Sequence, residues 1–520
     1  MSTTSETPPG SSPKEAATRL KGLWSFEGKY RTLHLTWFAF FLSFVVWFNF
    51  APFSKTIGEQ LDLTSGQLGT LALCNVALTV PARILIGMAL DRFGPRRVYT
   101  AILVYAAIPC LLFATADTFS MLVVSRLLLG IVGAGFVVGI RMVSEWFPPR
   151  EVGMAEGVYG GWGNFGSAAA AFSLPVIASW VGGDEGWRWA IGVTGVVAAI
   201  YGVIYYFSVR DTPEGVTYVR PRRQGALEVT NRGAVFGLAL LSLPFTGVLA
   251  LIAWRVWRVD VLSTTGLWIC FGLVLGLTVF QTRQVFTVNR AALNNEYEPS
   301  DTYPFRSVAV LCVAYFCTFG SELAVVSMLP TFFAETWDLD PRWAGWTASA
   351  FAWMNLAARP SGGLLSDLLG SRRRTLRTLL LGLIVGYVGM SLLSSAWPVA
   401  IAVVVCMCCS FFVQSGEGAV YAIVPLVKKR VSGQISGMAG AYGNVGAVVF
   451  LTALLYVTPS QFFLIIAGAS IVAVVSSRFL VEPTDSFGDQ LLTDEAPVGG
   501  VPVATAETEP TPAAVPSPTA

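Results

Sequence analysis

The sequence predicts an all-α membrane protein made of two six-helix bundles with an additional pair of spans between them, about fourteen spans in all. Three observations lead to this fold class. Of the 520 residues, 54% are hydrophobic and only 13% are charged, whereas a typical soluble domain is about 25% charged. Apolar stretches of about 20 residues, the length that crosses a bilayer, recur along the whole chain. Two motifs of the first half also recur, in the same order, in the second half.

The composition excludes several classes of function. The formal net charge of +2 gives no reason to expect a nucleic-acid partner, and a single histidine argues against a histidine-based metal site. The eight cysteines lie in apolar stretches and form no C-x-x-C pair, so we interpret them as small buried hydrophobic residues. Because no nucleophile triad or phosphate-binding loop appears, we expect neither an enzyme nor a protein with a metal ion or other cofactor.

Fourteen stretches are predicted as spans, with boundaries good to a few residues. In chain order they are 32–53, 66–91, 98–116, 121–147, 154–180, 187–209, 233–254, 262–281, 306–333, 342–366, 375–396, 398–427, 433–457 and 460–481. The polar segment before the first span lacks the pattern of a cleaved signal peptide, so we expect that span to be retained.

These spans divide the chain into five predicted parts. They are a cytoplasmic tail (1–30), an N-terminal six-helix bundle (31–210), a cytoplasmic linker with the inserted spans 233–254 and 262–281 (211–305), a C-terminal six-helix bundle (306–483) and an acidic tail rich in Pro, Ala and Thr (484–520). The composition of the last part predicts disorder.

Basic residues in the connecting segments predict the orientation of the chain. Arginine and lysine clusters follow the second, fourth, sixth and twelfth spans and precede the eleventh, which puts them all on one side of the membrane. By the positive-inside rule that side is the cytoplasm, so both termini are expected there, with the protein in the plasma (inner) membrane. Arg255 and Arg258, between the inserted spans, are the exception. The inserted pair therefore either crosses the bilayer or lies partly in its interface.

An internal repeat relates the two bundles. Arg83 lies eight residues before Asp91, and Arg359 lies eight residues before Asp367. The tetrapeptide GNFG at 163–166 likewise recurs as GNVG in the second half. Two bundles built on one plan and joined by a basic cytoplasmic loop are typical of secondary transporters.

Several motifs resemble those of the major facilitator superfamily and, within it, the nitrate/nitrite porter family. GMALDRFGPRR is similar to the superfamily's loop motif between its second and third helices, and RLLLGIVGAG resembles its fourth-helix motif. GVYGGWGNFG and GAYGNVG resemble the two nitrate signatures of the porter family. FGSELAVVSMLP, GEGAVYAIVPLVKKR and the inserted span pair resemble its cyanobacterial branch. The resemblance covers residues 20–483 and implies a permease for nitrate and nitrite.

Arg83 and Arg359 are the candidate substrate-binding arginines. Eight residues of helix put each of them about 12 Å from the aspartate at its helix end, near the middle of a bilayer core about 30 Å thick. A planar guanidinium can donate two hydrogen bonds to a planar oxyanion, and the resemblance implies that arginines at these positions bind nitrate. The alternative is a salt bridge inside the bundle.

Further substrate contacts follow from the resemblance. It implies that the amide of Asn164, and by the repeat that of Asn444, donates to the anion, and that aromatic rings enclose it. The aromatic residues are Tyr315, Phe136 and Phe319, and the glycines whose backbone the substrate would approach are Gly163 and Gly443. The alternatives are ordinary packing for the rings, close helix contact for the glycines and an interhelical hydrogen bond for Asn444.

A conformational latch is predicted at the basic loops. Asp91 at the C-terminal end of a helix is disfavoured by the helix dipole, so it should have a cationic or helix-N-terminal partner in another element. The resemblance implies that the loop motif locks one face of the transporter, with a weaker second copy in the other half. The residues of the two copies are Gly87, Asp91, Arg92, Gly94, Arg96, Arg97, Asp367 and Arg372. A purely topogenic role for the basic residues is the alternative.

Uptake of an anion against a negative interior needs a coupled ion, because it costs about 2.3 kcal/mol per 100 mV. Glu322 and Glu417 lie inside spans and are the candidate proton carriers, since buried carboxyl groups can hold protons near neutral pH. Arg126 joins this set, because either acid could instead form a structural pair with Arg83, Arg126 or Arg141. The sequence favours a monomeric, lipid-embedded importer of nitrate and nitrite that uses alternating access and proton symport. A nitrate/nitrite exchanger and a non-transporting nitrate receptor are the alternatives.

Overall fold

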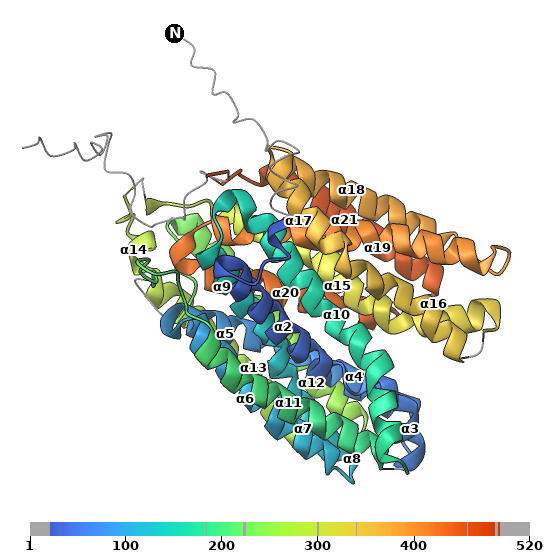
Figure 1. Ribbon diagram of the computed structural model, residues 1–520. Helices are drawn as coiled ribbons and strands as arrows, with labels where there is room; N and C mark the ends of the chain where they lie inside the picture. The colour runs from blue at the N-terminus through green and yellow to red at the C-terminus, as the bar shows by residue number, and fades with distance from the viewer. Residues whose placement is uncertain are drawn as a thin grey trace, which may run out of the picture.

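The computed structural model describes residues 21–483 and 487–488, apart from 184, 222–224, 299–300, 340 and 455. This part of the chain is helical and contains no strand, so the predicted all-α fold class is confirmed. Most of the two predicted tails lies outside the described residues. In Figure 1 long helices of the first half (blue to green) and of the second half (yellow to red) run lengthwise through the molecule.

The first half of the chain and the insertion follow the predicted order of apolar stretches. The elements are α2 (Gly28–Trp47), η1 (Ala51–Phe53), α3 (Ser54–Gln60), α4 (Ser65–Ala77), α5 (Thr79–Phe93), α6 (Pro95–Tyr105), α7 (Ala107–Ala114), α8 (Phe119–Leu129), η2 (Gly130–Gly135), α9 (Phe136–Trp146), α10 (Pro149–Val181), α11 (Gly186–Ser208), α12 (Arg232–Arg258), α13 (Thr264–Val288) and α14 (Arg290–Leu293). The helices α12 and α13 pack against each other as a pair.

The second half repeats this plan. Its elements are α15 (Phe305–Trp337), α16 (Pro341–Trp353), η4 (Met354–Leu356), α17 (Ala358–Leu368), α18 (Arg372–Ser391), α19 (Val399–Tyr421), η5 (Val424–Leu426), η6 (Lys429–Val431), α20 (Ser432–Leu454), α21 (Pro459–Ser476) and η7 (Ser477–Phe479).

Eleven helices in the described part are long and apolar enough to cross a membrane, and α12 and α13 are among them. The three other predicted spans coincide with α10, with α16 and α17, and with α18. These segments are less apolar because they carry the glycine signature and charged residues, of which Glu156, Arg359, Asp367 and Arg372 are buried. By contrast, only 6% of the most apolar stretch of α13 is buried inside the protein, so lipid must cover the rest of this helix.

Helices that carry the predicted site begin at irregular turns. The chain breaks between α4 and α5, where Thr79 Oγ1 donates a hydrogen bond to the carbonyl oxygen of Gly130 in η2 (2.5 Å). The turn η2 leads into α9, whose first residue is Phe136, and η4 leads in the same way into the start of α17, where Arg359 lies. Interruptions of this kind are tolerated in a membrane where protein buries the freed backbone groups, and in transporters they border the substrate site.

The two halves meet along two crossings, α5 with α20 and α10 with α17. At the first crossing, a Cβ on Gly87 would lie 2.6 Å from the carbonyl oxygen of Gly433. At the second, a Cβ on Gly153 would lie 2.6 Å from the carbonyl oxygen of Gly363. Glycine is therefore required at both crossings for the backbones to approach. We call this end of the molecule the latch end, because the predicted latch residues lie next to these glycines.

Candidate substrate-binding site

Arg83 on α5 and Arg359 on α17 come from opposite halves and meet in the interior, where each is at most 1% exposed. Their guanidinium carbons lie 5.4 and 5.1 Å from the centre of the same ring, that of Phe136. Arg83 Nη1 donates to the carbonyl oxygen of Gly440 (2.5 Å), and no carboxylate within the described residues forms an ion pair with this side chain. Arg359 instead pairs with Glu417, with 2.5 Å between Nη1 and Oε2. The two predicted arginines are thus brought together but have different counter-ions.

Aromatic rings line the space around the two guanidinium groups. The rings of Phe136 and Tyr315 are 6.2 Å apart and inclined by 3°, and those of Tyr315 and Phe319 are 5.1 Å apart and inclined by 6°. Tyr421 meets Phe136 and Tyr315 edge-on, at 4.7 and 4.8 Å. The Tyr315 hydroxyl accepts a hydrogen bond from Arg359 Nη2 (3.0 Å). The three predicted rings therefore form one nearly parallel stack beside both cations.

Two asparagine amides are buried without hydrogen-bond partners. Asn164 on α10 is 2% exposed and Asn444 on α20 is fully buried, and neither the nitrogen nor the oxygen of either amide is satisfied within the described part of the chain. A buried polar group without a partner usually indicates a missing ion, ligand or water. A Cβ on Gly443 would lie 2.7 Å from Tyr315 and 2.8 Å from Phe319, so this glycine admits the aromatic stack. A Cβ on Gly163 would instead collide with Phe40.

The two candidate proton carriers, Glu322 and Glu417, form no ion pair within the described residues with the arginines that the sequence analysis gave as their alternative partners. Glu322 Oε1 accepts from Asn355 Nδ2 (2.6 Å) and from Gln414 Nε2 (3.4 Å). Glu417 pairs with Arg359, and the two acids also act on each other electrostatically. The predicted alternative, a pair of either acid with Arg83, Arg126 or Arg141, is therefore wrong. It failed because the helix faces that meet cannot be read from depth in the membrane alone.

Arg126, which the sequence analysis included with the proton-coupling candidates, is not part of this cluster. Its Nη1 donates to Asn49 Oδ1 (3.0 Å) and its Nη2 to the carbonyl oxygen of Trp47 (3.1 Å). Its guanidinium also lies over the ring of Phe50 (5.3 Å). Neutral groups of the first half therefore surround Arg126, and the structure gives it a packing role.

The sequence analysis missed one buried acid near the site, Glu156 on α10. This side chain is 1% exposed, and Arg359 acts on it electrostatically. Its position directly before the sequence GVYGGWGNFG, inside the predicted span 154–180, was a usable signal. A search of every predicted span for acidic residues would have found it.

The first latch copy bridges the two halves. Asp91 at the end of α5 accepts hydrogen bonds from the backbone N–H groups of Gly433 (3.1 Å) and Gln434 (3.0 Å) at the start of α20. This is a helix N-terminus, the kind of partner that the position of Asp91 requires. Gly94 ends α5 with φ of 84°, and a Cβ there would meet the Asp211 side chain at 2.8 Å. Asp211 accepts from the backbone N–H of Arg96 (2.7 Å).

The second latch copy has the same construction. Asp367 at the end of α17 accepts from the backbone N–H groups of Gly153 (3.1 Å) and Met154 (2.7 Å) in the first turns of α10. Arg372 pairs with Asp367 (2.8 Å) and donates to the carbonyl oxygen of Pro149 (2.5 Å). Both copies therefore join a helix end of one half to a helix beginning of the other. The remaining predicted members, Arg92 and Arg97, make no contact across the halves among those that the structure records.

Charged residues close the latch end further. Glu145 on α9 pairs with Arg141 (2.8 Å) and with Lys429 in η6 (3.2 Å), and all three side chains are buried. Arg141 also donates to the Lys429 carbonyl oxygen and to the Ser432 hydroxyl. The segment that leads into α20 is thus held to the first half by ion pairs as well as by Asp91.

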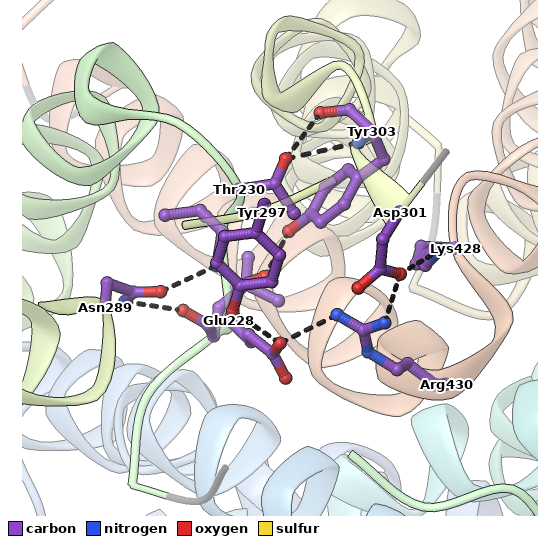
Figure 2. A network of polar contacts seen from close by, with 10 residues as sticks. Glu228, Thr230, Asn289, Tyr297, Asp301, Tyr303, Lys428 and Arg430 are labelled. Carbon is purple, nitrogen blue, oxygen red and sulfur yellow. Dashed lines mark hydrogen bonds and ion pairs between the residues drawn. The ribbon is translucent and has the colours of Figure 1, made fainter. Parts of the chain in front are cut away.

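A second polar network holds the same segment from the side of the linker (Figure 2). Arg430 in η6 donates to Glu228 (2.7 Å) and to Asp301 (2.5 Å), and Asp301 also accepts from Lys428 (3.0 Å). We call these four residues the linker anchor. Burial alone would raise the pKa of the Asp301 carboxyl, but its hydrogen bonds with Lys428 and Arg430 outweigh burial and lower that pKa. Asn289, at the end of α13, binds the backbone of Val229 (2.7 Å), which ties the inserted helices to the anchor.

Comparison with known proteins agrees with this fold and with the predicted resemblance. The family model described as Major Facilitator Superfamily matches residues 36–294 and 311–506. The nitrate/nitrite transporter NrtP of Picosynechococcus sp. is 50% identical over 510 residues, covering 90% of this chain and 96% of that protein. NrtP of Nostoc punctiforme is 47% identical over 477 residues, covering 90% and 95%. These relatives are named as transporters, in agreement with the prediction that the chain is not an enzyme.

Solved structures show the same fold at low sequence identity. The proton:xylose symporter XylE matches with a TM-score of 0.58 at 13% identity, covering 88% of this chain and 97% of that chain. The fucose:proton symporter FucP matches with a TM-score of 0.57 at 11% identity, covering 88% and 100%. The family match and the two relatives that are 50% and 47% identical show that the chain belongs to the Major Facilitator Superfamily and, within it, to the family of the cyanobacterial nitrate/nitrite transporters.

Proposed function

We propose that this chain imports nitrate and nitrite across the plasma membrane by alternating access, in symport with protons. The observation that carries the proposal is the meeting of Arg83 and Arg359, from opposite halves, over one aromatic ring. Relatives that are 50% and 47% identical are named as nitrate/nitrite transporters.

The charges at the site suit a small anion. Arg83 is fully buried, and no carboxylate within the described residues forms an ion pair with it. A charge in the interior is costly unless it is paired, so an anion that binds between Arg83 and Arg359 would supply the missing counter-charge. The unpartnered amides of Asn164 and Asn444 can add neutral hydrogen-bond donors from each half.

The shape of the site suits a flat anion. Phe136, Tyr315 and Phe319 present ring planes that are within 6° of parallel between neighbours. A planar oxyanion beside such faces keeps its edge free for the guanidinium groups, which donate in their own plane. Tetrahedral phosphate or sulfate would be too thick to use both features at once.

Alternating access would use the latch end as the inner gate. In this state Asp91 and Asp367 each join a helix end of one half to a helix beginning of the other. By the positive-inside rule, the basic loops support a cytoplasmic position for this end and for both termini. Nitrate would therefore enter from the opposite side, and its release would require both latch copies to open.

Proton coupling would arise because Glu417 and the anion compete for Arg359. In this structure Glu417 lies 2.5 Å from the guanidinium of Arg359. Protonation of Glu417 removes its negative charge and leaves Arg359 free to bind nitrate, so proton and anion bind together. One proton with each nitrate also makes the transported charge neutral, which removes the cost of about 2.3 kcal/mol per 100 mV. Glu322, which acts on Glu417, would take part in loading this proton.

Uptake by proteoliposomes tests the proposal against its alternatives. Symport predicts that a pH gradient, acidic outside, drives nitrate accumulation in vesicles without internal nitrite. Accumulation only in vesicles loaded with nitrite would overturn symport in favour of exchange. Nitrate binding without any flux would instead indicate a receptor.

A further inference from the structure

Glu156 is a buried carboxyl group to which the cycle above gives no role. It lies on α10 and is 1% exposed, and neither of its side-chain oxygens has a hydrogen-bond partner within the described residues. An ionised carboxylate in such surroundings costs several kcal/mol unless it is paired, so we infer that Glu156 is neutral and protonated in this state.

The position of Glu156 lies between the substrate arginines and the latch end. One helical turn along α10, a Cβ on Gly160 would lie 2.5 Å from Nε of Arg359, so this face of α10 lies directly on that guanidinium. In the other direction, Gly153 and Met154 donate to Asp367 of the latch. At the rise of an α-helix, Glu156 is about 6 Å along the axis from Gly160 and about 4.5 Å from Gly153.

Arg359 is the charged group that acts on Glu156 across the interface of the two halves. The titratable groups that neighbouring helices bring toward α10 have partners of their own. They are Glu417 on α19 with Arg359, Glu145 on α9 with Arg141, Asp367 on α17 with Arg372, Lys29 on α2 with Glu151, Tyr205 on α11 with Thr36, and Tyr159 on α10 itself with the carbonyl oxygen of Phe136. A change in the charge of Glu156 therefore acts mainly on Arg359.

Two carboxyl groups thus approach one guanidinium from opposite halves. Arg359 can neutralise one anion at a time, and in this state that anion is the carboxylate of Glu417. We propose that Glu156 is the alternative counter-ion of Arg359. It holds a proton while the latch is closed, and it takes the place of nitrate on Arg359 when nitrate leaves toward the latch end.

The release step balances in atoms and charge. The O–H bond of the Glu156 carboxyl breaks, and the proton passes to water on the latch side. Nitrate leaves the guanidinium of Arg359, and the Glu156 carboxylate takes up the vacated donors. One anion replaces another, so the empty carrier returns without a bare cation in its interior. During the return the O–H bond of Glu417 breaks and its proton passes to the Glu156 carboxylate, while the Glu417 carboxylate takes its place on Arg359. This restores the starting state with one proton carried for each nitrate. This role rests on the proposed proton symport, to which it adds an acid on the release side.

The test measures nitrate binding calorimetrically with the purified full-length chain, for wild type, Glu156→Gln and Glu151→Gln. Ionised Glu156 competes for Arg359, so wild-type affinity should fall as the pH rises, by up to about tenfold per pH unit for each linked proton. Glu156→Gln removes one of the competitors for Arg359. The nitrate affinity of this variant should therefore decrease less steeply with pH than that of wild type, by a factor of up to about ten per pH unit. Glu151 lies on the same helix and pairs with Lys29, so Glu151→Gln should match wild type. Equal pH dependence in wild type and Glu156→Gln would overturn the proposal.

Two further measurements keep the proposal testable if Glu156→Gln does not fold. Infrared spectra of wild type and Glu156→Asp should differ in a neutral-carboxyl band of the nitrate-free protein, and the absence of a difference would overturn it. In proteoliposomes, pH-driven accumulation should be lost in a folded Glu156→Gln protein, and unchanged accumulation would overturn the role of Glu156 alone. A wild type without pH-driven accumulation would overturn symport and, with it, this role.

Discussion

Replacement of Arg83 by lysine tests the proposed anion clamp, because it keeps the charge and removes the planar fork. Nη1 of Arg83 donates to the carbonyl oxygen of Gly440 (2.5 Å) and Nη2 makes only a long hydrogen bond to that of Gly133 (3.5 Å), while Nε has no partner within the described residues. The edge formed by Nε and Nη2 is therefore the one that we assign to the substrate. Lysine would retain that backbone contact or contact the anion, but would not present two parallel donors. The loss of one hydrogen bond to a charged partner costs about 2 kcal/mol, so the KM for nitrate should rise about 30-fold.

The assay is the initial rate of nitrate uptake by proteoliposomes at several nitrate concentrations, with the amount of inserted protein measured in parallel. Arg126→Lys is the matched control, because Arg126 is equally buried but donates to Asn49 and Trp47 rather than to the site. Its KM should stay within about twofold of wild type, since surrounding neutral groups rather than substrate bind it. A wild-type KM for Arg83→Lys, or the same increase for Arg126→Lys, would refute the assignment of Arg83 to the substrate.

Three further changes address proton coupling, the latch and the linker anchor. Glu417→Gln removes the carboxylate that competes for Arg359. Nitrate exchange between compartments of equal pH should therefore persist, while pH-driven nitrate accumulation should fall at least about tenfold. Equal losses of nitrate exchange and nitrate accumulation would contradict this role. Asp91→Asn weakens two hydrogen bonds to the start of α20, each worth about 1 kcal/mol, so hydrogen exchange over 428–440 should speed up, and unchanged exchange would count against the latch. Because the pKa of Asp301 is lowered, its contacts stabilise the fold at neutral pH and are lost on acidification below about pH 4. Asp301→Asn should therefore lower the melting temperature at neutral pH and flatten its fall toward acid, and an unchanged acid profile would disprove the contribution.

The arginine pair could be predicted from the sequence because its signal is local. Each arginine lies eight residues before an aspartate on the same helix, and that spacing sets its depth whatever the other helices do. The same holds for Asp91, whose position at a helix end calls for a helix-N-terminal or cationic partner, and the structure supplies the start of α20.

The counter-ions could not be predicted in this way. Glu417 pairs with Arg359 because particular faces of α17 and α19 meet, and depth in the membrane does not determine which faces meet. Arg126 has a depth and a burial that resemble those of a functional arginine, but its partners are an amide and a backbone carbonyl. Glu156 was open to prediction, since an acid inside an apolar stretch is a signal that needs no tertiary information.

The difference between the two halves explains how a symmetric plan can support a coupled cycle. Glu322 and Glu417 belong to the second half. At the repeat distances of 276 to 280 residues, the equivalent positions in the first half are 42–46 and 137–141, and none of these residues is acidic. Arg83 therefore forms no ion pair with a carboxylate of the described chain, whereas Arg359 pairs with Glu417. In the proposed cycle, Arg83 attracts the anion without a competing carboxylate, and Arg359 accepts it only after Glu417 is protonated. A site with two permanently free arginines would bind nitrate whatever the protonation state of Glu417, so the proposed symport depends on the divergence of the repeats and not on their symmetry.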